Sequence, residues 1–247
     1  MKKRRRTLEL KHTALLTTFF LMPFICSCAT VVTESESQKA AAYYNIGVGR
    51  LSEDKIQQAF VEFQRAYELN PNNKEVLTAI GIIYLFYFDE TEKAIDFFQK
   101  AIRVDPDYSE AYNSLGYAHE KLGQFDVAIP YYKKAVANLR YVNPAKAFVN
   151  MGRSYYRTGR YDEAATAYKE AIKRAPTLDL PYLGLALCYN ATGRYGDASA
   201  ALSRAISLNP AYKGDAKLAA EDFNTRRLTA SGYEQKDLAD YIEILKY

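Results

Sequence analysis

Residues 145–178, AKAFVNMGRSYYRTGRYDEAATAYKEAIKRAPTL, decide the fold of this chain. The first half repeats small and apolar residues at the i, i+3, i+4, i+7 spacing of one helix face. These residues are Phe148, Met151, Gly152 and Tyr155. Gly159 interrupts the helix, and a second helix with Ala164 and Tyr168 on one face runs to Pro176. Because Gly152 and Ala164 are small, the stretch predicts two closely crossing helices whose exposed apolar surface needs neighbours to stack on.

The same pattern occurs five times along the chain. The copies are 40–73, 74–108, 109–142, 145–178 and 179–212. Each has an apolar residue and Gly or Ala in the first helix, then Ala, a large apolar residue and Ala in the second. A period of about 34 residues with this order resembles the tetratricopeptide (TPR) repeat. We therefore expect an all-α fold, a TPR α-solenoid of five clear repeats.

The repeats are less regular at two places. Between the third and fourth repeats Arg140 stands where other repeats end in Pro, and two extra residues precede the fourth. After the fifth repeat, residues 213–247 keep only part of the pattern. We interpret 213–247 as a pair of capping helices or a degenerate sixth repeat, because the end of a solenoid needs a polar outer side.

The overall charge of +4 gives no reason to expect nucleic-acid binding. Residues 2–11 carry six basic side chains and one acidic side chain, a local charge of +5. Subtracting +5 from +4 leaves about −1 for the rest of the chain, so no basic surface is indicated there.

The first 27 residues resemble a bacterial lipoprotein signal peptide. A basic start is followed by an apolar segment, 14–25, which has the length of a signal-peptide core and is short for a membrane span. Ile25 and Ser27 precede Cys28 as in a lipobox, which makes Cys28 the expected lipidation site. Two alternatives remain open, an uncleaved anchor and cleavage without lipidation. All three place the repeats on the far side of the cytoplasmic membrane.

The resemblance to lipoproteins also implies a location. Ala29 stands at the position where Asp favours retention at the inner membrane, so we expect an outer-membrane lipoprotein that faces the periplasm. Residues 28–39 are polar and without periodicity, and we expect a tether there.

We expect no enzymatic activity. The chain contains no glycine-rich phosphate loop, no Cys/His metal spacing and no nucleophile–histidine pair. His119 stands at a packing position that is Tyr in other repeats, and Cys188 is expected to be a small buried residue. No cofactor, metal ion, nucleic acid or small-molecule substrate is expected.

Function is therefore expected from a protein-binding surface. In TPR proteins the first helices line a concave groove through fixed positions of each repeat. Transferred to this chain, those positions give the candidate groove residues Tyr44, Asn113, Tyr117, Arg153, Tyr156, Arg157 and Asn190. Tyr and Arg are also the residue types that are enriched in interface hot spots.

A lipobox followed by five or six TPRs resembles the outer-membrane lipoproteins of type IV pilus biogenesis, the pilotins. The junction LRYVNPAKAFVNMG (139–152) is similar to that family's connection between its third and fourth repeats. The resemblance implies a scaffold that binds secretin subunits and promotes their outer-membrane localisation and multimerisation. The alternative is a TPR lipoprotein adaptor for peptidoglycan hydrolases or proteases in the cell envelope.

Overall fold

The structure is a computed structural model that describes residues 32–247. This part of the chain contains twelve α-helices and no strand. They are α1 (Glu34–Ser52), α2 (Ile56–Leu69), α3 (Lys74–Phe86), α4 (Thr91–Val104), α5 (Ser109–Lys121), α6 (Phe125–Ala137), α7 (Pro144–Arg157), α8 (Tyr161–Arg174), α9 (Leu180–Ala191), α10 (Tyr195–Leu208), α11 (Ala216–Thr229) and α12 (Gly232–Ile244).

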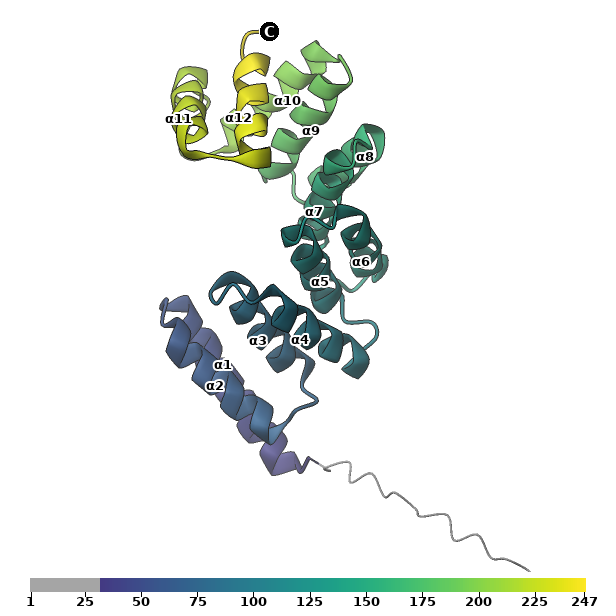
Figure 1. Cartoon of the computed structure of the whole chain (residues 1–247), viewed down its shortest axis with the longest axis vertical. Coiled ribbons are helices and arrows are strands. Elements are labelled where there is room, and N and C mark those ends of the chain that lie inside the picture. The colour runs from purple at the N-terminus through teal and green to yellow at the C-terminus, as the bar shows by residue number, and fades with distance from the viewer. Residues whose placement is uncertain (1–31) are drawn as a thin grey trace, which may run out of the picture. The chain divides into compact units, whose positions relative to one another are not determined.

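Consecutive helices pack in pairs, and the pairs stack in chain order. Within repeats, α1 packs on α2, α3 on α4, α5 on α6, α7 on α8 and α9 on α10. The second helix of each of the first four repeats also packs on the first helix of the next repeat (Figure 1). The expected fold class, an all-α TPR solenoid, is confirmed.

A close glycine–aromatic contact holds each of the first four helix pairs together. A Cβ atom added to Gly152 would lie 2.9 Å from the Tyr168 ring, so the ring of α8 occupies the space above α7. The same contact joins Gly47 to Phe63, Gly81 to Phe98 and Gly116 to Tyr132. The small residue therefore makes room for the large side chain of the partner helix, and Ala164 is fully buried at the same interface.

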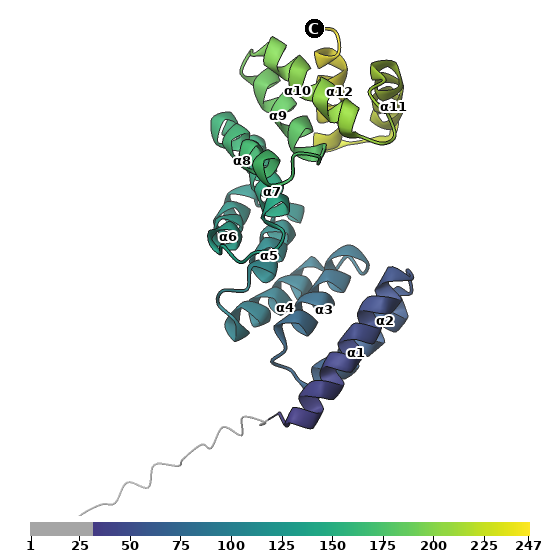
Figure 2. The same ribbon diagram turned by 180° about the vertical axis from the view of Figure 1, so that it is seen from behind.

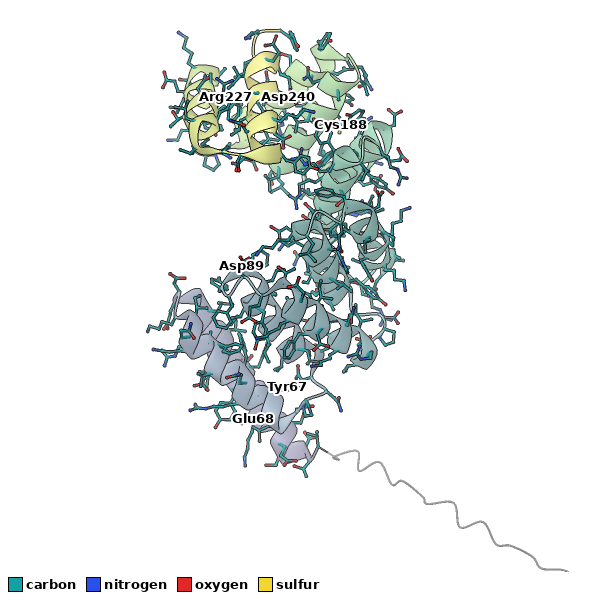
Figure 3. The ribbon with its side chains drawn as sticks, viewed as in Figure 1. Tyr67, Glu68, Asp89, Cys188, Arg227 and Asp240 are labelled. Atoms are coloured by element: carbon teal, nitrogen blue, oxygen red, sulfur yellow. The ribbon has the colours of Figure 1, made fainter. Side chains whose placement is uncertain are left out.

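The turns between paired helices use residues with a positive φ angle. In the third to fifth repeats these are Gly123, Gly159 and Gly193. In the first two repeats Asp54 and Asp89 take this conformation, with φ of 57° and 55°. Asp tolerates the left-handed region better than most residues. Asp89, labelled in Figure 3, also accepts a hydrogen bond from Lys121 Nζ at 2.6 Å.

The expected tether differs from the structure over residues 34–39, which are helical. The Thr33 side chain accepts a hydrogen bond from the Glu36 backbone N–H, and the Glu36 carboxylate accepts one from the Thr33 backbone N–H. This capping box satisfies free donors at the start of α1 and extends the helix toward the N-terminus. The expected signal peptide 1–27 and the lipidation site Cys28 lie outside the described residues.

The C-terminal segment 213–247 forms the helix pair α11 and α12. Unlike the second helices of the repeats, α12 packs against α9 and α10 as well as α11 (Figures 1 and 2). Leu238 and Ile244 of α12 are almost fully buried there. Among helices of residues 32–247, none combines the length and the apolar character needed to cross a bilayer.

Candidate protein-binding groove

A cavity of about 280 Å³ lies between the first helices of the N-terminal repeats, and we call it the N-terminal groove. Its walls come from α1, α3, α5, the start of α7 and the loop before α7. Tyr44, Val48 and Ile82 contribute aromatic and apolar surface. Charged and polar side chains complete the wall, among them Glu75, Glu110 and Lys146. The mixture suits a segment with both apolar and polar side chains.

Three tyrosines of the N-terminal groove are held in the protonated form. Burial raises the pKa of the Tyr44, Tyr108 and Tyr141 hydroxyls. The carboxylates of Glu75 or Glu110 raise the pKa of each hydroxyl further. These groups therefore remain hydrogen-bond donors throughout the physiological pH range.

A buried polar network links the first helices of the third and fourth repeats. Asn150 Nδ2 of α7 donates to Asn113 Oδ1 of α5 at 3.1 Å, and Arg153 Nη2 donates to Asn150 Oδ1 at 3.0 Å. Arg153 Nε also donates to Glu120 of α5. The Tyr132 hydroxyl donates to the same carboxylate at 2.8 Å. Asn113 and Arg153, both predicted groove residues, thus hold the third and fourth repeats together.

Tyr117 lies beside this network and is more accessible. The Tyr117 ring stacks on Phe86 with centroids 5.3 Å apart. The guanidinium of Arg153, on α7, lies 5.7 Å from the centroid of the Tyr117 ring. Phe86 is 54% exposed. Phe86 at the end of α3 is exposed and Tyr117 in the second half of α5 is half-buried, and we call them the Phe86–Tyr117 pair.

In the fourth and fifth repeats, the first helices are covered by α12. Arg157 of α7 donates two hydrogen bonds to the Asp237 carboxylate, one from Nη1 to Oδ1 at 2.8 Å and one from Nη2 to Oδ2. The Arg157 guanidinium also lies 4.6 Å from the centroid of the Tyr233 ring on α12. The Arg157 side chain is only 9% exposed, so a partner protein has little access to it.

A second cavity, of about 390 Å³, remains between α7, α9, α11 and α12. Arg153, Tyr156 and Arg157 contribute to its wall, together with Asp237 and Tyr241 of α12. Burial raises the pKa of Tyr156 and of Asp240, a second carboxyl group on α12 (Figure 3). We call this space the C-terminal cavity.

The structure divides the seven predicted groove residues among different environments. Tyr44 and Asn113 line the N-terminal groove, whereas Arg153, Tyr156 and Arg157 line the C-terminal cavity. Tyr117 belongs to the Phe86–Tyr117 pair, and Asn190, near the end of α9, lines neither space. They do not line a single cavity.

Sequence reasoning missed several residues of these two spaces. Glu75, Glu110 and Lys146 occupy the second position of their repeats, and this regular spacing was a usable signal. Asp237 and Tyr233 gave no such signal, because α12 lies outside the repeat register.

Residues that often carry chemistry are used for packing in the described part of the chain. His119 stacks on Tyr131 with centroids 5.3 Å apart, and its Nδ1 lies 2.8 Å from Gln124 Oε1. Cys188 is buried in α9 (Figure 3), and burial raises the pKa of its thiol to about 12. Within residues 32–247, no three His, Cys, Asp or Glu side chains are grouped to hold a metal ion.

Comparison with protein families finds TPR sequences. A TPR repeat model matches residues 89–123, and a model of the C-terminal domain of cilia and flagella-associated protein 70 matches residues 108–214. Anaphase-promoting complex subunit 3 of Schizosaccharomyces pombe is 42% identical over 64 residues, 26% of this chain and 10% of that protein. The chain spans only about a tenth of the length of the first curated relatives that it matches. It is a TPR repeat protein.

Comparison with solved structures finds the same fold in PilF and in PilW. The structure reported with the functional characterization of Pseudomonas aeruginosa pilF has a TM-score of 0.69 and 16% identity, covering 84% of this chain and 90% of that chain. PilW, described as a widely conserved type IV pilus biogenesis factor, has a TM-score of 0.65 and 21% identity, covering 81% and 99%. At these identities the similarity shows the fold alone.

Proposed function

We propose that this protein is a non-enzymatic envelope scaffold that binds a segment of a partner protein on the first helices of its N-terminal repeats. The observation that carries this proposal is the N-terminal groove, where tyrosines, aliphatic side chains and both acidic and basic side chains line one cavity. Repeat solenoids present extended surfaces of this kind to protein partners. The proposal assigns the chain no cofactor.

We further propose that the partner is a secretin subunit, which the protein helps to localise and multimerise in the outer membrane during type IV pilus assembly. Support comes from the resemblance of the junction 139–152 to pilotins and from the fold shared with PilF and PilW over more than 80% of this chain. The lipobox-like sequence before Cys28 supports an outer-membrane anchor.

The functional test uses a deletion strain of the source organism and heat-resistant secretin multimers as the readout. Phe86 and Tyr117 lie one helical turn beyond the groove residues Ile82 and Asn113, on the same helix faces. Replacing both Phe86 and Tyr117 by Ala should leave the helix pairs folded but reduce multimers, because truncating aromatic anchors removes much of the binding energy. The matched control is Tyr195→Ala with Tyr247→Ala, an exposed aromatic pair with centroids 4.7 Å apart that lies far from the groove in the sequence. Arg153 is unsuitable, since its loss would leave Glu120 buried without its partner.

The deletion strain also separates the proposal from its alternative. Secretin monomers and the absence of pili are expected in that strain. Normal secretin multimers there would contradict the pilotin role and favour an adaptor for peptidoglycan hydrolases or proteases.

The proposed anchor is tested separately by Cys28→Ser. Lipid labelling should disappear and the protein should move to the soluble periplasmic fraction, because stable anchoring requires more than one acyl chain. Retention of the variant in carbonate-washed membranes would instead indicate an uncleaved anchor.

A further inference from the structure

The charged side chains of the N-terminal groove follow the repeat register. Glu75, Glu110 and Lys146 lie in the first turns of α3, α5 and α7, and all three stand at the second position of their repeats. All three line the same cavity. One edge of the groove therefore carries the charge order negative, negative, positive from the second to the fourth repeat.

The two carboxylates are poorly neutralised by neighbouring side chains. Lys74 donates to Asp105 at 2.5 Å, while its distance to the nearer Glu75 oxygen is 3.9 Å. Within the described residues, neither Glu110 nor Lys146 has an ion-pair partner within 4 Å. The groove thus retains negative charge that a basic ligand would complement.

Thr78, between these edges, provides an independent indication of a missing polar partner. Its side chain is 5% exposed and lines the groove. In the described structure its Oγ1 atom is buried without a hydrogen-bond partner, and the interaction with the nearby Tyr108 hydroxyl does not reach hydrogen-bond geometry. Buried hydroxyls are almost always satisfied, so a ligand group that meets Thr78, once its side chain turns toward the groove, would supply the missing partner.

We propose that the N-terminal groove binds an extended protein segment with two Lys or Arg residues about three positions apart, opposite Glu75 and Glu110. Packed helices lie about 10 Å apart. An extended chain of the polyproline II type advances about 3.1 Å per residue with three residues per turn, so ligand side chains three positions apart lie on one face and match the spacing of one repeat. Apolar ligand side chains would contact Val48 and Ile82 at the other edge, and a ligand backbone group would bond Thr78. This inference rests on the proposed function and specifies the partner's chemistry.

The test selects random peptides displayed on phage against the full chain in detergent, followed by fluorescence anisotropy with the recovered peptides. Wild-type protein should enrich peptides with basic residues about three apart. Replacing Glu75 and Glu110 by Gln should weaken these peptides about tenfold, the order expected for two partly exposed ion pairs. The matched control is Glu68→Gln with Glu92→Gln, exposed carboxylates on the second helices α2 and α4.

A second variant locates the binding. Replacing Val48 and Ile82 by Gln changes the apolar edge without changing charge and should also weaken the recovered peptides. Peptides that need Val48 and Ile82 but show no basic preference would overturn the inference and leave groove binding intact. Failure to recover any peptide that depends on the groove would overturn the groove-binding proposal as well.

Discussion

At the scale of single residues, the repeat depends on one glycine in the first helix. In the fourth repeat the Tyr168 ring contacts Gly152 of α7 and also Gly184 of the following repeat, where an added Cβ would lie 2.1 Å from the ring. The ring is thus enclosed by two backbones at once. Protein interiors are packed too densely to absorb even one added methyl group at such a place without movement.

Gly152→Ala should therefore lower the free energy of unfolding by about 1–3 kcal/mol, the usual cost of overpacking. Urea denaturation followed by circular dichroism measures it. Gly49→Ala on α1 is the control, since nothing lies within 4 Å of its added Cβ. The control should be stabilised by up to about 1 kcal/mol through helix propensity, and equal destabilisation of both variants would contradict the packing role of Gly152.

At the scale of elements, α12 is the helix that departs most from the repeat pattern. Its Asp237 pairs with Arg157, 80 residues earlier in the chain, and both side chains are mostly buried. Removing one partner of a buried pair leaves a charge without compensation, which is more costly than never having the pair.

Asp237→Ala should lower the free energy of unfolding by about 3 kcal/mol. Arg157→Ala combined with Asp237→Ala should lose less than the sum of the two single changes, as expected for directly coupled residues. The exposed α8 pair Arg160 and Glu163 is the control, and its loss should cost under about 1 kcal/mol. Additive losses in the double-mutant cycle would argue against direct coupling of α12 to α7.

At the scale of the whole described unit, the core is divided unequally. One cluster of buried side chains runs from Ala128 to Ile244, whereas the first two repeats share a smaller cluster between Ala40 and Ile83. Only Ala40 and Gly47 of α1 are buried. In a repeat protein, stability is distributed as a sum over repeats and their interfaces, so the N-terminal end is expected to open first.

Native-state hydrogen exchange followed by mass spectrometry tests this distribution. Amides of α1 should exchange before those of α8, α9 and α12, because local opening of α1 exposes few apolar contacts. Earlier exchange in α12 than in α1 would contradict the stabilising role of the C-terminal helix pair.

The sequence predicted those features that recur with the repeat. Helix pairing, the small residue at Gly152 and the turn at Gly159 all follow from periodicity and from local backbone preferences. The helical start at Thr33 was missed because its capping box precedes any apolar repeat. The contact of Asp237 with Arg157 was not predictable either, since it joins a repeat position to a helix outside the register.

The Arg157–Asp237 ion pair also limits where a repeat can be added to this chain. Arg157 belongs to the fourth repeat, so the ion pair with Asp237 spans a fixed interval that contains the fifth. Duplication of a repeat within that interval would move the carboxylate away from the guanidinium by one unit. Duplication before α7 leaves the interval unchanged, so evolution or engineering can lengthen this protein at its N-terminal side, where the open groove would grow with it.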